Sequence, residues 1–350
     1  MPAAVILGRG IAGLTCAALL LERGWAVELC GDRPVMPPAV LLNPITCTLL
    51  TQVWGQSDLL SDAIPLRRRR VAWGDAAAVD VPDPGMSVGG AALLDRLEHE
   101  FTARVAGRPM IALEHSWVLD ARGRPRGEHE GNRPAGHRCI IAAEIDAAPE
   151  AGGDTAVIAS VREGWVFALP ASNGRMLVQA MVAEAPADPA ATLTHILAAT
   201  ALPLRPLLAV PGLFPSGPVV FPAAPGLAPR LAEPGRLRVG DRGVAVDPLC
   251  GDGTGNAVRA ALLACACAAA VEEGAPEDAV LAHYENRLHT AYAAHLRTCI
   301  ALYQQAFNSA AWRAELGAMR ASLARIPQRR PAAYGLAGRS LVPLVATTPA

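Results

Sequence analysis

The sequence predicts an α/β fold in which a nucleotide-binding domain carries an inserted antiparallel sheet. A Gly-x-Gly-x-x-Gly motif at residues 8–13 lies between a strand-like run and a helix-like run. A second glycine-rich segment, residues 251–255, precedes a long apolar stretch. Between these two segments, residues 138–182 contain four short strand-like runs separated by turn residues, with no helical pattern among them. Consecutive strands without intervening helices are typical of an antiparallel sheet.

The first 30 residues have the order strand, glycine loop, helix, strand. Residues 3–7 form a short apolar run, residues 11–23 are rich in leucine and alanine, and residues 25–30 form a second apolar run. The glycine motif falls between the first run and the helix, which is its place in a Rossmann-like dinucleotide-binding unit. The sequence therefore predicts a βαβ unit here.

Each glycine of the motif has its own physical role. Gly8 permits a tight turn, Gly10 allows a pyrophosphate to approach the backbone, and Gly13 allows the helix to pack closely on the strand. The phosphates are expected beside Ile11 and Ala12, because free N–H groups and the helix dipole favour negative charge at the start of a helix. These five residues are the predicted diphosphate site.

An acidic residue at the end of the second strand usually binds the ribose hydroxyls. Here Gly31 occupies that place, Asp32 follows it, and Glu28 lies earlier in the strand. We select Asp32 as the ribose ligand, with a simple turn cap as the alternative. Arg33 is a candidate for contacting a phosphate oxygen, although it is equally well explained as a solvated side chain.

The remaining helices and strands follow from the apolar periodicity. Helices are expected at 45–60, 91–105, 190–201, 255–271 and twice within 277–325, and further strands at 67–81 and 117–120. The proline-rich residues 203–234 are expected to form a loop-like return to the first domain. We assign residues 1–66, 91–130 and 235–275 to the nucleotide-binding domain, 67–90 and 131–234 to a substrate-binding sheet, and 276–350 to C-terminal helices.

The charge balance argues against a nucleic-acid partner. The chain has 31 basic and 32 acidic residues, a net charge of -1, and all of its basic residues are arginine. Phosphate binding along a polymer needs a concentrated excess of positive charge.

The most apolar segment, residues 257–271, includes Arg259 and is shorter than the roughly 20 residues of a membrane span, so a buried helix is expected. No charged and apolar leader pattern precedes the first strand, and we expect a cytoplasmic protein.

The cysteines and histidines show no metal-binding pattern. The cysteines are scattered, without a Cys-x-x-Cys pair or zinc-like spacing, and are expected to be small buried hydrophobic residues in a reducing compartment. His283, His289 and His295 recur at intervals of six, which does not place them on one face of a helix. No metal site is therefore expected.

The second glycine-rich segment resembles a known flavin-binding motif. Gly240-Asp241, followed by the run from Asp247 to Asn256, is similar to the Gly-Asp segment of FAD-dependent monooxygenases of the aromatic hydroxylase type. The resemblance implies that Asp241 holds the ribityl chain of FAD and that Pro248 lies beside the flavin ring. It places the following turn and helix start at the pyrimidine edge, where a helix dipole favours the charge of reduced flavin. The turn residues concerned are Gly251, Gly253, Thr254, Gly255 and Asn256.

Two weaker resemblances lie between these segments. Residues 120–124 resemble the Asp-Ala-x-Gly strand end of the same family. Residues 165–170 resemble the Trp-x-Trp-x-Ile-Pro signature of flavin-dependent halogenases and, almost equally, a motif of geranylgeranyl reductases; alternating aromatic residues on a sheet face explain them as well. We select Trp165, Phe167 and Cys250 as pocket candidates. The arginine that often precedes the helix at 91–105 is absent, because Gly89 and Gly90 stand there.

The resemblance implies an FAD-dependent monooxygenase, in which a flavin C4a-hydroperoxide hydroxylates an electron-rich small-molecule or peptidyl aromatic substrate. NAD(P)H or a separate reductase would supply the electrons. Two alternatives stay open: an accessory flavoprotein that oxidises a residue of a partner protein during quinone-cofactor maturation, and an alkene reductase of the geranylgeranyl type. Halogenases of the tryptophan type use an active-site lysine, and this sequence contains no lysine.

Overall fold

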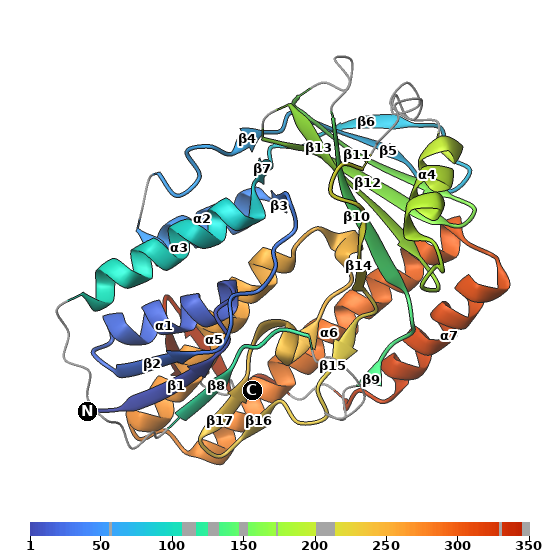
Figure 1. Ribbon diagram of the computed structural model, residues 1–350. Coiled ribbons are helices and arrows are strands. Elements are labelled where there is room, and N and C mark those ends of the chain that lie inside the picture. The colour runs from blue at the N-terminus through green and yellow to red at the C-terminus, as the bar shows by residue number, and fades with distance from the viewer. Residues whose placement is uncertain are drawn as a thin grey trace.

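A computed structural model describes residues 1–55, 58–106, 117–124, 133–146, 153–172, 174–200, 214–328 and 331–344 (Figure 1). Two large sheets organise the chain. The first contains the N-terminal βαβ unit, the second contains the middle of the sequence, and one long C-terminal helix runs from the first sheet to the second (Figure 1). The predicted α/β class and the Rossmann-like unit are confirmed.

The first sheet has five strands in the order β16-β17-β8-β1-β2. The four strands from β17 to β2 are parallel, and β16 pairs antiparallel at the edge. Their bounds are Ala3–Leu7 for β1, Ala26–Cys30 for β2, Trp117–Asp120 for β8, Ala232–Glu233 for β16 and Arg236–Arg238 for β17. Strands from both ends of the sequence therefore share one sheet, which brings the two glycine-rich segments toward the same region.

Helices α1 (Ile11–Glu22) and α5 (Gly253–Glu272) pack against each other beside this sheet (Figure 1). Their contact is close enough for the Cys265 thiol to donate to the carbonyl of Cys16 at 3.6 Å. By length and composition α5 would be able to cross a membrane, but 67% of its apolar window is buried inside the protein. It is the buried helix that the sequence predicts.

The second sheet has seven strands in the order β14-β10-β13-β12-β11-β5-β6. All neighbours are antiparallel except β11 and β5, which are parallel. The bounds are Arg68–Ala72 for β5, Val79–Pro82 for β6, Cys139–Asp146 for β10, Thr155–Val161 for β11, Gly164–Ala171 for β12, Arg175–Val182 for β13 and Val219–Pro222 for β14. Binding of substrate by this sheet stays a prediction.

Alternation along β12 gives the seven-stranded sheet two buried faces. Val166 and Ala168 pack with Leu193 of α4 (Pro189–Ala199), which covers one face. Trp165 and Phe167 point to the opposite face and join the main core that extends through the first sheet and its helices. Both faces are thus used for packing.

Helix α6 (Glu277–Ala306) connects the two sheets, and α7 (Ala310–Ala324) packs against it. Near the start of α6, the Tyr284 hydroxyl donates to the carbonyl of Arg238 on β17 at 2.7 Å. Near its end, the Tyr303 hydroxyl accepts from the indole N–H of Trp165 on β12 at 3.2 Å. One helix therefore makes buried contacts with both parts of the molecule.

Smaller elements complete the fold. Helices α2 (Pro44–Trp54) and α3 (Gly90–Val105) lie on the far side of α1 from the first sheet in Figure 1. The short strands are β3 (Val40–Leu42), β4 (Ile64–Pro65) and β7 (Met86–Val88), which form one sheet, and β9 (Arg133–Pro134), β15 (Gly226–Leu227) and β18 (Val244–Ala245), which form another. Strands β19 (Tyr334–Ala337) and β20 (Ser340–Pro343) form a hairpin.

Three sequence expectations need correction. The helix predicted at 45–60 ends at Trp54, because Gly55 adopts the left-handed conformation with φ 71° and caps it. The proline-rich stretch is more than a loop, since β14 joins the second sheet as an edge strand, where proline is tolerated. The C-terminal region holds the β19-β20 hairpin as well as helices, with Gly338 at φ 60° in its turn.

Candidate functional site

Of the three motif glycines, only Gly10 has room for a Cβ without a clash. A Cβ on Gly8, whose φ is +109°, would lie 2.4 Å from the carbonyl oxygen of Ala121. A Cβ on Gly13 would lie 1.9 Å from the carbonyl oxygen of Gly8. At Gly10 the nearest atom would be a side-chain carbon of Pro34 at 3.5 Å, which is an ordinary contact. The space beside Gly10 is therefore available to a ligand, as expected for a pyrophosphate.

Two helices begin at the predicted cofactor site without a capping side chain. Neither α1, which follows Gly10, nor α5, which follows Asp252, has a side-chain cap or an acidic residue in its first turn; α3 shares this property. By contrast, side chains cap α2, α4 and α7. An uncapped helix start presents unsatisfied N–H groups and a partial positive charge. The starts of α1 and α5 therefore fit an anionic diphosphate and the electron-rich edge of a flavin.

The two predicted flavin segments touch in the folded chain. Gly240 has φ +61°, and a Cβ placed there would lie 3.1 Å from the Cβ of Ala12. The short helix η4 (Gly240–Arg242) therefore lies against the first turn of α1. This contact brings together residues that lie far apart in the sequence, at the place where one FAD molecule would need both.

Asp241 has a partner that sequence reasoning did not identify. Its carboxylate accepts from Nε of Arg124 at 3.2 Å, and Arg124 also donates to the carbonyl of Ala224 at 2.6 Å and to that of Val246. Burial raises the pKa of the Asp241 carboxyl, and the charge of Arg124 opposes this rise. Asp241 is thus oriented by an arginine from the segment that follows β8.

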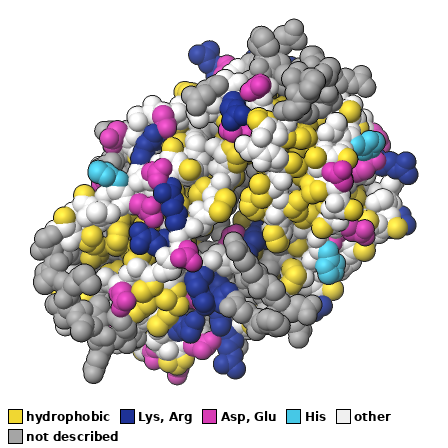
Figure 2. Space-filling view, viewed as in Figure 1, with side chains coloured by type: hydrophobic (Ala, Val, Ile, Leu, Met, Phe, Trp, Pro, Cys, Tyr) yellow, Lys and Arg dark blue, Asp and Glu magenta, His cyan; other side chains and the backbone are white. Residues whose placement is uncertain are grey.

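The Asp120 carboxylate, at the end of β8, is paired with three arginines. Arg122, Arg236 and Arg242 all donate to it at 2.8 to 3.2 Å. Burial acts to raise the pKa of Asp120, but the three arginines outweigh it and lower this pKa to about 2. The strand end that resembles the family's Asp-Ala-x-Gly motif therefore carries an ion cluster, and arginines gather near β8 and β17 on the face shown in Figure 2.

The three residues that follow β2, Gly31 to Arg33, have different surroundings. Gly31 has φ +103°, and a Cβ there would approach the backbone nitrogen of Gly8 at 3.3 Å. Asp32 is exposed, and its predicted role at the ribose stays a prediction. The guanidinium of Arg33 lies 2.5 Å from Asp95 and 3.5 Å from Glu98 on α3. Arg33 is therefore held by α3 in this structure.

The turn before α5 is anchored on α2. The Asp252 carboxylate accepts from the amide of Asn43 at 3.1 Å and from the hydroxyl of Thr46 at 3.0 Å, and it pairs with Arg259. A Cβ on Gly255 would lie 2.2 Å from the Asp252 carboxylate and 2.4 Å from the Thr46 hydroxyl, so a side chain there would displace these groups. The Asn256 side chain donates to the carbonyl of Val244 at 3.3 Å. These bonds fix the turn against the start of α2 and against β18.

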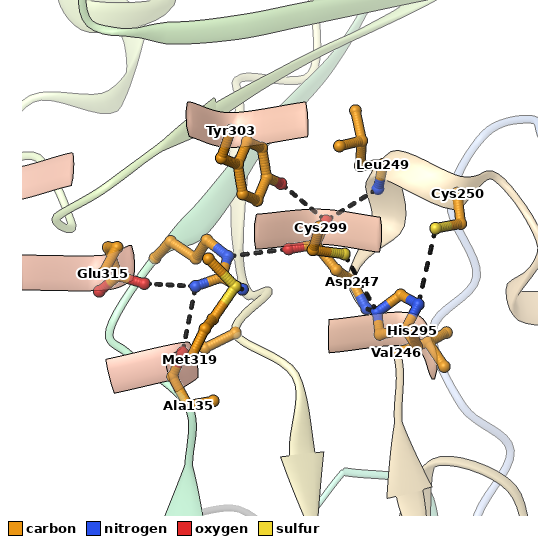
Figure 3. Close-up of polar contacts among 12 residues, drawn as sticks. Ala135, Val246, Asp247, Leu249, Cys250, His295, Cys299, Tyr303, Glu315 and Met319 are labelled. Carbon is orange, nitrogen blue, oxygen red and sulfur yellow. Dashed lines mark hydrogen bonds and ion pairs between the residues drawn. The ribbon is translucent and has the colours of Figure 1, made fainter. Parts of the chain in front are cut away.

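A buried ion cluster fixes the beginning of the same turn (Figure 3). Arg138, fully buried, donates from Nε to Asp247 at 2.8 Å and from Nη1 to Glu315 at 2.5 Å. The other carboxylate oxygen of Asp247 accepts from the Tyr303 hydroxyl at 2.8 Å and from the backbone N–H of Leu249 at 2.9 Å. This cluster joins the turn, the second sheet and both C-terminal helices.

The three pocket candidates have different environments. Trp165 is only 1% exposed and is hydrogen-bonded to Tyr303, as described above. Phe167 is partly buried against the main core, and Cys250 is exposed at the end of the short helix η5 (Pro248–Cys250). Their assignment to a substrate pocket stays a prediction.

Cys250 belongs to a cluster with His295 and Cys299 (Figure 3). Its sulfur lies 3.5 Å from Nδ1 of His295, and the Cys299 sulfur lies 3.5 Å from Nε2 of the same ring. Hydrogen bonds from Cys299 and then from His295 lower the pKa of Cys250 to about 5. Cys250 is exposed, and Cys30 and Cys47 are partly exposed. The expectation that the cysteines are buried is therefore wrong for these three residues.

Solved structures supply the comparison that sequence does not. No protein-family model and no curated protein matches the chain. QhpG, a peptidyl tryptophan dihydroxylase essential for tryptophylquinone cofactor biogenesis, superposes with a TM-score of 0.75 at 20% identity, covering 98% of this chain and 86% of QhpG. The chain has the fold of flavin-dependent monooxygenases. This flavoprotein fold also occurs in CmlS, a flavin-dependent halogenase, with a TM-score of 0.74 at 18% identity over 89% of this chain and 67% of CmlS.

A third structure with the flavoprotein fold holds the cofactor. HpxO of Klebsiella pneumoniae, solved with FAD and uric acid, matches with a TM-score of 0.64 at 17% identity over 93% of this chain and 92% of HpxO. The resemblance inferred from the two glycine-rich segments is thus confirmed at the level of fold.

Proposed function

We propose that this protein is an FAD-dependent monooxygenase that hydroxylates an electron-rich aromatic substrate. One observation carries the proposal: Gly10, where a Cβ would fit without a clash, stands at the uncapped start of α1, and η4 packs against that same turn. The occurrence of FAD in HpxO and of hydroxylation in QhpG, both with this fold, supports the choice of cofactor and reaction.

The residues present fit FAD in specific roles. The backbone N–H groups of Ile11, Ala12 and Gly13 would bind the diphosphate, because they have no partner within the helix. Asp241 would accept from the ribityl hydroxyls while Arg124 holds it in place. Asp32 would bind the ribose, at the end of β2.

The turn and the start of α5 would contact the flavin ring. Pro248 lies at the first position of η5, and Gly253 and Thr254 open α5. The positive end of this helix would stabilise negative charge at the pyrimidine edge. When bound, FAD would supply the reaction of reduced flavin with oxygen, and the protein would orient the substrate and exclude water.

Two substrate classes are compatible with this proposal. QhpG acts on a peptidyl tryptophan, and its fold covers nearly the whole chain, which favours an aromatic residue of a partner protein. HpxO was solved with uric acid, which favours a small aromatic molecule. A halogenase is not proposed despite the similarity to CmlS, because the lysine that tryptophan halogenases use has no counterpart in a sequence without lysine.

FAD binding is tested by titrating FAD into the apo protein and its Gly10→Val variant. Extended backbone at Gly10 accepts any residue, so the variant should fold, but its side chain would fill the space for the diphosphate. Gly317→Val on α7 is the matched control, because a Cβ there meets no atom within 4 Å. We expect wild type and control to bind FAD equally and Gly10→Val to lose binding. Equal binding by all three proteins would contradict the assignment.

The reaction is tested with the FAD-loaded protein, reduced and then exposed to labelled oxygen. Candidate substrates are small electron-rich aromatics and tryptophan-containing peptides. Mass spectrometry should find one oxygen atom from O₂ in the product. A hydroxylated product without label would refute the monooxygenase, because its oxygen would come from water. Saturation of an added alkene in place of hydroxylation would favour the reductase.

A further inference from the structure

The fold places two cysteines and a histidine from distant positions in one cluster. Cys250 lies at the end of η5, whereas His295 and Cys299 lie one turn apart on α6. The two sulfur atoms and a ring nitrogen all lie within 4.8 Å of one another. Cys250 is exposed and Cys299 is buried.

The hydrogen bonds of His295 determine what this cluster does. The backbone N–H of Asp247 donates to Nε2 of His295 at 2.7 Å, so the lone pair on Nε2 is already used. In the neutral imidazole the proton is then on Nδ1, which faces the Cys250 sulfur. Neither ring nitrogen offers a free lone pair to a metal ion. The Nδ1–H of His295 points at the Cys250 sulfur, and a hydrogen bond of this kind stabilises the thiolate form of the cysteine.

We propose that Cys250 and Cys299 form a thiol pair that is oxidised to a disulfide by hydroperoxides. The exposed Cys250 thiolate is the group that meets the oxidant, and the buried Cys299 thiol is the group that resolves the product. An accessible thiolate beside a second thiol is the usual arrangement of peroxide-sensitive cysteines.

The chemistry balances with hydrogen peroxide as the oxidant. The Cys250 sulfur attacks one peroxide oxygen, the O–O bond breaks, and hydroxide leaves and is protonated to water, which yields a sulfenic acid. The Cys299 sulfur then attacks the Cys250 sulfur, the S–O bond breaks, and a second water leaves with the thiol proton. Two thiols and one peroxide give one disulfide and two waters, and the sulfur atoms supply the two electrons.

The disulfide would join η5 to α6, and so would constrain the turn that begins at Asp247. Reduced flavins that react with oxygen without a substrate release hydrogen peroxide, so the oxidant would form next to the pair if the proposed function is correct. The proposal itself does not depend on that function, because peroxide can be added to the purified protein.

The direct test uses wild-type protein that has been reduced, freed of reductant and treated with hydrogen peroxide. Digestion without reductant and mass spectrometry should identify a linked pair of peptides that contain Cys250 and Cys299. In Cys299→Ser, Cys250 should remain as a sulfenic acid that a cyclic dione traps. In Cys250→Ser, an exposed substitution, neither product should form.

Cys30 is the matched control, since it is partly exposed and burial raises its pKa. At pH 6 the thiolate fraction of Cys250 should be on the order of a thousandfold higher, and its lower intrinsic nucleophilicity should remove about a hundredfold of this advantage. Iodoacetamide should therefore label Cys250 roughly tenfold faster than Cys30.

Three results would overturn the proposal. The first is peroxide-treated wild type in which Cys250 is oxidised but never linked to Cys299. The second is equal labelling rates at Cys250 and Cys30. The third is purified protein that holds stoichiometric zinc which protects both cysteines, because the cluster would then be a metal site.

Discussion

Replacing Arg138 with methionine would leave two buried carboxylates without a cation. Arg138 and Asp247 have 0% side-chain exposure and Glu315 has 4%, so water cannot replace the lost charge. Removing one partner of a buried ion pair typically costs about 3 to 5 kcal/mol. Because Arg138 serves two carboxylates, we expect a loss at the upper end of this range. Neutralising one carboxylate, as in Asp247→Asn or Glu315→Gln, leaves a matched pair and should cost about 1 to 3 kcal/mol.

The assay is urea unfolding of the apo proteins, followed by tryptophan fluorescence. Arg175→Met is the matched control, because Arg175 also faces two carboxylates, Glu144 at 2.6 Å and Asp146 at 3.7 Å, but is 30% exposed. We expect the control to lose at most about 1 kcal/mol. Equal losses for Arg138→Met and Arg175→Met would refute the argument from burial.

Three further outcomes are expected. Gly13→Ala should fold poorly and lose stability by thermal melting, because its Cβ would overlap the carbonyl of Gly8, and a melting temperature equal to wild type would contradict this. Asp120→Asn should lower the free energy of unfolding by about 2 kcal/mol at pH 7, because the pKa of Asp120 in the folded protein is near 2 and its usual value is 3.8. This stabilisation is present above about pH 4 and is lost as the pH falls toward 2. Denaturant curves of the variant and of wild type should therefore converge near pH 2. Asp241→Asn should weaken FAD binding by about 1 to 3 kcal/mol in a flavin titration, with a smaller loss of stability because Arg124 loses its ion pair; unchanged affinity would remove Asp241 from the cofactor site.

Local patterns predict the parts of this fold that depend on neighbouring residues in sequence. The βαβ unit could be located because strand, loop and helix signals follow one another within residues 3–30. The four strand-like runs in the middle of the chain became β10 to β13 for the same reason. The contact between Gly240 and Ala12 was anticipated only through resemblance, since no local pattern specifies which distant segments meet.

The ion cluster illustrates why the rest was not predictable. Arg138, Asp247 and Glu315 lie in three unconnected segments, and each residue by itself reads as an ordinary surface charge. Only the fold shows that they share a buried site.

The thiol cluster did leave a signal that was overlooked. His295 and Cys299 are four positions apart on a predicted helix and therefore share a face. Spacing within the histidines alone, or within the cysteines alone, does not reveal this mixed pair. The third member, Cys250, depends on how η5 meets α6, which sequence periodicity does not encode.

Helix α6 has a mechanical consequence for any substrate. Its 30 residues span about 45 Å. Hydrogen bonds hold it to β17 through Tyr284 and to Trp165 of β12 through Tyr303. Hinge opening between the two sheets would have to break these bonds together. We therefore expect the two parts to move as one rigid body, so that substrate entry and product exit depend on rearrangement of surface loops and side chains, with no domain closure in the catalytic cycle.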